Sequence, residues 1–188
     1  MKSINKISIF LLLGLIIFLS GCTSPKDKFE EDYQMFKNVD HVFEKVNYRS
    51  AYNALTGKGK YVIVFAYDPD LYVCPYCMEV LPILNEAALE SEVVKILYLD
   101  IRTMRVERTD EYTELIDYIF DQVDDLESRE GKLEIIVPDV YVVSDGEILA
   151  HHVATLKDDE GKYILGLDDN QKGELKDIYI NMFDKLKS

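Results

Sequence analysis

The 188-residue chain has little positive charge, since 21 lysines and arginines stand against 35 aspartates and glutamates, a net charge of −14 at pH 7. It lacks a basic patch, which argues against nucleic-acid binding and against electrostatic attraction to anionic lipid. It also lacks internal repeats and low-complexity tracts, and it has only three cysteines. The apolar run from Ile7 to Leu19 is shorter than the roughly 20 residues of a membrane-spanning helix.

That apolar run instead has the features of a signal peptide, because lysines precede it and small residues end it. Residues 19–22 read LSGC, which resembles the bacterial lipobox, where the cysteine is lipidated and becomes the first residue of the mature protein. We therefore expect residues 1–21 to be a lipoprotein signal peptide. Cys22 would anchor the protein in the cell membrane, on the extracytoplasmic face. The alternative is an uncleaved signal anchor with an incidental cysteine.

The rest of the chain alternates between strand and helix patterns. Residues 22–39 are charged and contain a Ser-Pro break, so we interpret them as a tether with a short helix near its end, followed by one domain over 40–188. Apolar runs and amphipathic spacing predict strands at 39–46, 61–67, 93–101, 140–143 and 147–153, and helices at 50–55, 75–90, 110–126 and 172–186. This alternation predicts an α/β domain with a mixed sheet, in which the late hairpin adds antiparallel strands.

The sequence Cys74-Pro75-Tyr76-Cys77 follows a predicted buried strand and opens a predicted helix. If Cys22 is lipidated, Cys74 can pair within the chain only with Cys77, and so short a loop adds little stability, which favours a chemical role. Pro75 suits the first helical turn and places Cys74 at or next to the N-cap. There the helix dipole and free N–H groups stabilise a thiolate, the attacking species in disulfide exchange, while Cys77 suits a resolving role.

A C-x-x-C pair can also be half of a zinc site, which would need two more ligands. The other candidates are His41, His151 and His152, together with carboxylates. His151 and His152 are adjacent on a predicted strand and therefore point to opposite faces of the sheet. We expect no metal at this site, and the proposed chemistry needs no organic cofactor.

Two prolines extend the motif into a resemblance to the thioredoxin superfamily. Propensity alone would end the helix at Leu81, but thioredoxin-like proteins place a kinking proline at the offset of Pro82. Val137-Pro138, followed by a short strand and a glycine-containing turn, looks like the cis-proline segment of this family. The resemblance covers about residues 40–188 and implies a thioredoxin-like fold, with a mixed central sheet flanked by helices.

The resemblance also implies the site. The loop at Pro138 would pack against the Cys74–Cys77 pair, and the backbone of Val137 would pair with an extended substrate peptide beside Tyr76. The alternative for Pro138 is a trans proline at the start of an edge strand.

The chain departs from the thioredoxin pattern in two places. Val64 and Ile96 align with a buried aspartate and a nearby lysine of thioredoxins, so the usual proton acceptor for Cys77 is missing. The 38 positions from Asp100 to Pro138 predict an enlarged helical crossover before the cis-proline segment. In this respect the chain resembles proteins similar to the bacteriocin transport accessory family and related thiol–disulfide oxidoreductases.

These features predict a protein thiol–disulfide oxidoreductase with Cys74 and Cys77 as its redox pair. Its partners would be thiols or disulfides of exported proteins or peptides, and a membrane electron donor or acceptor. The alternative is a non-catalytic thioredoxin-like accessory or binding protein of an export or bacteriocin system, which would use the groove beside Pro138 to dock a peptide.

Overall fold

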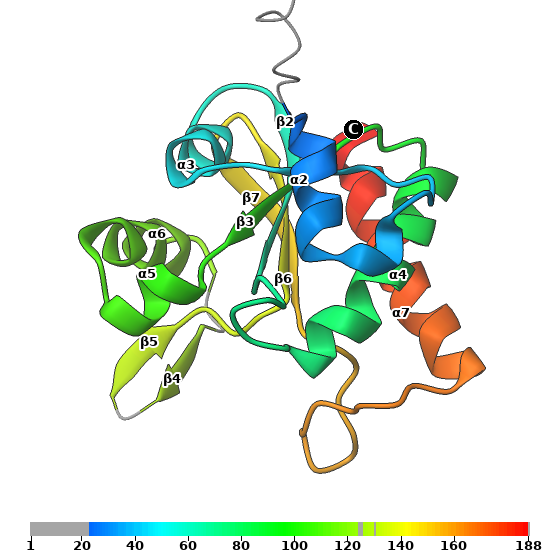
Figure 1. Cartoon of the computed structure of the whole chain (residues 1–188). Helices are drawn as coiled ribbons and strands as arrows, with labels where there is room; N and C mark the ends of the chain where they lie inside the picture. The colour runs from blue at the N-terminus through cyan, green and yellow to red at the C-terminus, as the bar shows by residue number, and fades with distance from the viewer. Residues whose placement is uncertain (1–22, 124–125, 130, 188) are drawn as a thin grey trace, which may run out of the picture.

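A computed structural model describes residues 23–123, 126–129 and 131–187 (Figure 1). The predicted signal peptide and the predicted lipidation site, Cys22, lie outside the described residues. In the described part of the chain, no helix is both long enough and apolar enough to cross a membrane.

The centre of the fold is a five-stranded mixed sheet with the order β1-β3-β2-β6-β7. β1 (Phe43–Lys45), β3 (Ile96–Asp100) and β2 (Lys60–Ala66) are parallel, and β6 (Asp139–Ser144) and β7 (Glu147–Val153) continue the sheet antiparallel to them. The last five residues of β2 are all buried, because helices cover both faces of this central strand.

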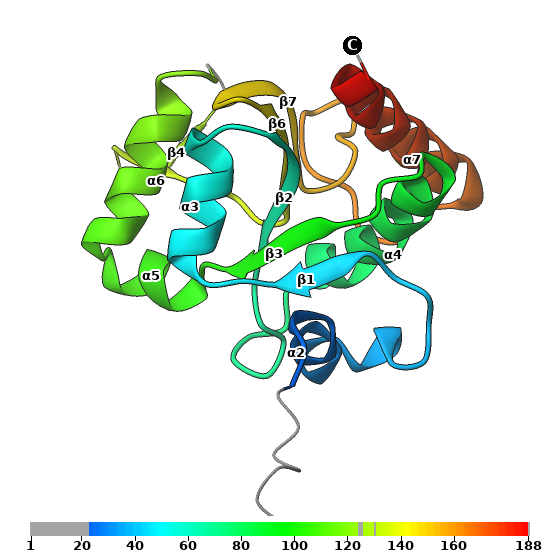
Figure 2. The ribbon, with the colours of Figure 1, turned by 90° about the horizontal axis from the view of Figure 1, so that it is seen from above.

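Helices flank both faces of the sheet. α4 and α7 cover one face, and α3 and α6 cover the other (Figure 2). This arrangement confirms the predicted thioredoxin-like α/β fold. The bounds are α2 Pro25–Asp32, α3 Tyr48–Thr56, α4 Pro75–Glu90, α6 Asp110–Phe120 and α7 Asp169–Asp184, with single 3-10 turns at Gln34–Phe36 and Lys185–Lys187.

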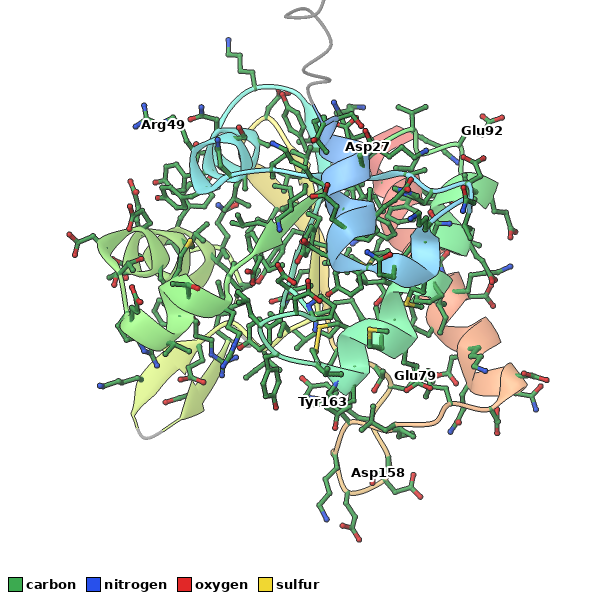
Figure 3. All side chains as sticks on the ribbon, in the orientation of Figure 1. Asp27, Arg49, Glu79, Glu92, Asp158 and Tyr163 are labelled. Atoms are coloured by element: carbon green, nitrogen blue, oxygen red, sulfur yellow. A yellow bond between two sulfur atoms is a disulfide. The ribbon has the colours of Figure 1, made fainter. Side chains whose placement is uncertain are left out.

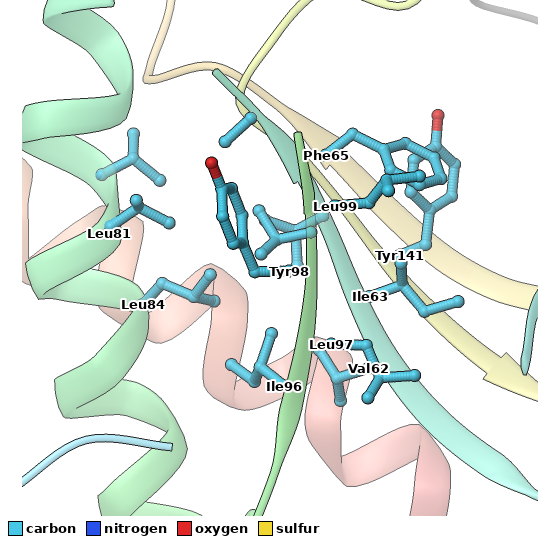
Figure 4. Close-up of a cluster of buried hydrophobic side chains, with 14 of the residues drawn as sticks. Val62, Ile63, Phe65, Leu81, Leu84, Ile96, Leu97, Tyr98, Leu99 and Tyr141 are labelled. Carbon is cyan, nitrogen blue, oxygen red and sulfur yellow. The ribbon is translucent and has the colours of Figure 1, made fainter. Parts of the chain in front are cut away.

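α4 has the predicted bounds and continues through Pro82, as the resemblance implied. Its apolar side packs on the sheet, where Leu81 and Leu84 face Ile96 and Tyr98 of β3 (Figure 4). All four side chains are fully buried. This packing fixes the position of the helix that carries the two cysteines.

The crossover before the cis-proline segment differs from the single helix predicted at 110–126. It contains α5 (Arg102–Glu107), then α6, then a hairpin of β4 (Glu127–Arg129) and β5 (Lys132–Glu134). α5 ends at Glu107, and its C-cap Arg108 has a left-handed backbone conformation (φ 52°). α6 ends at Phe120, so the last part of the predicted amphipathic stripe lies beyond the helix.

The segment 22–39, predicted as a tether, is packed onto the domain through three aromatic side chains. Phe29, Tyr33 and Phe36 are at most 3% exposed. The ring of Phe29 stacks on that of Phe43 in β1 at 4.6 Å between centroids. Phe29 lies in α2, Tyr33 is the C-cap of that helix and Phe36 ends the 3-10 turn that follows, and together the three rings cover the sheet edge at β1. The folded domain therefore begins no later than α2, not at residue 40.

Candidate active site

Cys74 and Cys77 form a disulfide at the N-terminus of α4, with their Cα atoms 5.2 Å apart. Cys74 is the N-cap of the helix, and its Sγ accepts a hydrogen bond from the backbone N–H of Cys77 at 3.2 Å. Pro75 occupies the first helical turn, as the sequence predicts. Cys74 is 5% exposed and Cys77 is fully buried, so the sulfur predicted to attack is the outer of the two.

The loop before β6 lies directly against this disulfide. The peptide bond between Val137 and Pro138 is cis. The carbonyl oxygen of Val137 is 3.9 Å from Sγ of Cys74, a van der Waals contact because a disulfide sulfur carries no hydrogen. The pairing of β6 with β2 begins at Asp139, so Val137 lies just outside the ladder. The structure thus brings together the two motifs that the sequence analysis placed at the site.

A second loop, from β7 to α7, approaches the start of α4 on its other side. The hydroxyl of Tyr76 donates to the carbonyl oxygen of Tyr163 at 3.4 Å. The carboxylate of Glu79 accepts from the backbone N–H groups of Gly166 at 3.0 Å and Leu167 at 2.6 Å. Figure 3 shows Glu79 and Tyr163 beside the start of α4. Charge-assisted bonds of this kind are strong, so Glu79 fixes the loop to the helix.

Glu79 is a site residue that the sequence pattern does not indicate. An acidic residue in the first half of a helix is ordinarily explained by the helix dipole. Its role here depends on a loop almost 90 residues away, whose exposed N–H groups no local pattern reveals.

His151 and His152 point to opposite faces of β7, as predicted. The ring of His151 stacks on Tyr141 at 5.4 Å, and the ring of His152 meets Tyr179 of α7 edge-on at 5.5 Å. His41 lies 3.2 Å from a carboxylate oxygen of Glu30. In the ranges that the structure describes, no group of three or more His, Cys, Asp or Glu residues is placed to hold a metal ion.

His152 borders a cavity of about 240 Å³ next to the β7–α7 loop. Its Nε2 atom is buried and has no hydrogen-bond partner among the described residues. Burial lowers the pKa of His152 to about 4, and the neighbouring His151 and Lys157 add to this effect. His152 is therefore neutral at pH 7, a state that the buried position favours.

This pKa shift predicts a loss of stability in mild acid. The pKa of His152 is about 4 in the folded chain and 6.5 in its ordinary state, so between these values the unfolded chain binds more protons. The free energy of unfolding should therefore fall as the pH falls through this window. His152→Gln should remove this part of the pH dependence, as measured by urea unfolding at about pH 7 and about pH 4.5. An equal fall in both proteins would contradict the assignment.

A partly buried cluster of charges holds the loop that precedes Cys74. Nζ of Lys45 lies 2.5 Å from Oδ2 of Asp32 and 3.5 Å from Oδ2 of Asp68. The hydroxyl of Tyr33 donates to the carbonyl oxygen of Tyr67 at 2.5 Å. Burial raises the pKa of Asp32, and Lys45 opposes this effect. α2 and β1 are therefore bound directly to the active-site loop.

Val64 and Ile96 are both fully buried apolar residues. The positions that carry aspartate and lysine in thioredoxins thus provide neither a proton acceptor nor a charge here. Asp32 and Lys45 do form an ion pair, but they lie on α2 and β1. They do not occupy the sequence positions of the thioredoxin aspartate and lysine.

No protein-family model matches the chain, and no curated protein matches it. Among solved structures, it is similar to the short form of thioredoxin f from spinach chloroplast, at 15% identity over 79% of this chain and 96% of that chain, with a TM-score of 0.43. It is also similar to oxidised thioredoxin O2 from Arabidopsis thaliana, at 16% identity over 76% and 96% of the two chains, with a TM-score of 0.42. Thioredoxin from Trypanosoma brucei brucei matches at 15% identity over 80% and 97%, with a TM-score of 0.42.

The assignment to the thioredoxin-like fold comes from the chain itself. It rests on the strand order, the antiparallel hairpin at one sheet edge, and the cis-proline loop beside a C-x-x-C disulfide. These features define a thioredoxin-like domain with an intact cysteine pair.

Proposed function

We propose that the protein is a thiol–disulfide oxidoreductase that acts on exported proteins or peptides. The observation that carries the proposal is the disulfide between Cys74, at the N-cap of α4, and the buried Cys77, with the Val137 carbonyl 3.9 Å from the outer sulfur. A helix N-terminus stabilises a thiolate, and a thiolate is the nucleophile of disulfide exchange.

The exchange proceeds in two steps. The Cys74 thiolate attacks one sulfur of a substrate disulfide, forming a mixed disulfide and releasing the other substrate sulfur as a thiolate. Cys77, as its thiolate, then attacks Sγ of Cys74 and releases the first substrate sulfur. Two electrons and two protons pass from the protein to the substrate. The same steps in reverse oxidise a substrate dithiol, and a dithiol or disulfide partner restores the starting state.

The backbone N–H of Cys77 supports the first step. It lies 3.2 Å from Sγ of Cys74 and stays in place when the disulfide opens, because it belongs to the first turn of α4. This N–H stabilises negative charge on the attacking sulfur, a charge-assisted hydrogen bond.

Turnover of a peptide disulfide with a dithiol as electron donor tests the proposal. The protein should raise the rate above that of the dithiol alone. A protein that binds the peptide but leaves this rate unchanged would favour the alternative, a non-catalytic accessory protein of an export or bacteriocin system.

We also propose that a lipid on Cys22 anchors the protein to the extracytoplasmic face of the cell membrane. The support is the LSGC sequence after an apolar run that is too short to span a bilayer. Cys22→Ser should move the protein from the membrane fraction to the soluble fraction, or leave an uncleaved precursor. Unchanged processing with unchanged extraction by detergent would exclude the anchor.

A further inference from the structure

The three apolar side chains directly before Cys74 are exposed to solvent. Leu71 is 58% exposed, Tyr72 is 50% exposed and Val73 is 63% exposed. On α5, Val106 is 69% exposed. Apolar groups that gather on a surface beside a reactive centre are typical of a binding region.

Specific contacts hold the loop in this shape. The carbonyl oxygen of Asp68 accepts from the backbone N–H groups of Leu71 at 3.1 Å and Tyr72 at 3.0 Å. The guanidinium of Arg102 lies 4.7 Å from the ring centroid of Tyr72, a cation–π contact. Because the loop is fixed from within and from α5, the exposure of these side chains is a property of the fold.

Leu71 and α5 together line a cavity of about 210 Å³. Its walls are Leu71, Arg102, Thr103, Val106 and Glu107. Figure 1 shows the β2–α4 loop between α5 and the start of α4. The cavity lies outside the carboxyl ends of β2 and β3, where α/β sheets commonly bind ligands. Leu71 is three residues before Cys74, so the two lie within about 10 Å along the chain.

The arginines near the cavity differ in whether they are paired with a carboxylate. Arg105 and Arg108 each pair with the carboxylate of Glu134, at 2.5 Å and 2.6 Å. For Arg102, no carboxylate of the described residues lies within ion-pair distance of the side chain. In a chain with a net charge of −14, Arg102 thus gives one wall of the cavity a positive charge without an ion pair, while Glu107 gives another wall a carboxylate.

We propose that this cavity is a specificity subsite for the substrate polypeptide. It receives an aliphatic or aromatic side chain located two or three positions from the reactive cysteine of the substrate. A carboxylate next to that side chain pairs with Arg102. The inference rests on the proposed function and names the substrate class of the same site.

Peptides that carry one cysteine as a mixed disulfide with thionitrobenzoate test the subsite, because the released thiol is coloured. The peptides place Leu-Asp, Ser-Asp or Leu-Lys two or three positions before or after the cysteine. In at least one of these placements, the reduced protein should react about tenfold faster with Leu-Asp than with Ser-Asp, the discrimination expected of one apolar pocket. Leu-Lys should also react more slowly than Leu-Asp.

Two substitutions and a matched control locate the effect. Val106→Asp should abolish the preference for Leu over Ser, and Arg102→Gln should abolish the preference for Asp over Lys. Val94→Asp introduces the same charge at a 91% exposed valine in the turn before β3, and it should keep both preferences. The readout is the ratio between peptides, so a general loss of activity does not imitate the result.

The outcomes separate the subsite from the proposed function. A wild-type protein that reacts with all peptides at one rate, or a Val94→Asp protein that behaves like Val106→Asp, would overturn the subsite. Reaction with hydroxyethyl disulfide in the same experiment shows whether exchange itself occurs. If that reaction is absent too, the proposed oxidoreductase function fails, and the subsite fails with it.

Discussion

Cys74→Ser is expected to reduce peptide-disulfide exchange to the background of the dithiol alone, because a serine hydroxyl cannot replace the attacking thiolate. Cys77→Ser should behave differently. It keeps the sulfur at the N-cap of α4 but lacks the buried sulfur that resolves the intermediate. This variant should complete the first step and accumulate mixed disulfides with substrate. Turnover assays and mass spectrometry under non-reducing conditions measure the two results.

Tyr76→Phe is the matched control for these variants, since it changes the residue between the cysteines and keeps both sulfurs. It removes only the hydroxyl that donates to Tyr163 at 3.4 Å, a long hydrogen bond. Exchange should continue in this variant. More mixed disulfide on Cys74→Ser than on Cys77→Ser would reverse the assigned roles of the two sulfurs.

Phe29→Ala should lower the free energy of unfolding by about 3–5 kcal/mol, the usual cost of truncating a buried phenylalanine. The ring of Phe29 is fully buried and packs on Tyr33, Phe36 and Phe43. Its removal leaves a cavity between α2 and the sheet edge. Urea unfolding of the full chain measures the change.

Met35→Ala is the control within the same segment. Met35 is 41% exposed, so its truncation should change the free energy of unfolding by no more than about 0.5 kcal/mol. Equal small effects at Met35 and Phe29 would mean that this segment is a tether, as its charged sequence suggested. A large effect at Phe29 alone would establish α2 as part of the domain.

The elements near the cysteines could be predicted because their sequence signals are local and agree with one another. Pro75 in the first turn and a continuous apolar strand before the motif predict the position of α4. Pro82 is the exception, since propensity would end the helix there and only the resemblance extends it. The resemblance likewise pointed to Pro138, which no rule of spacing would place beside Cys74.

The parts that could not be predicted depend on long-range contacts. Phe29, the one buried residue of α2, has charged residues on both sides, so the helix looks polar until β1 is placed against it. α5 has only six residues and none of them is buried, which leaves no periodic signal. The ion cluster of Asp32, Lys45 and Asp68 joins three elements that are distant in sequence.

The packing of α2 has a mechanical consequence for an anchored protein. Only Thr23 separates Cys22 from the Ser24 cap of α2, and α2 ends beside the loop that carries Cys74. Figure 1 shows the start of α2 at the top of the domain and the start of α4 in its lower half. With a lipid on Cys22, the helix acts as a rigid strut, about 12 Å long for its eight residues. The disulfide would then stay close to the bilayer, and its substrates would be chains that come near the membrane surface.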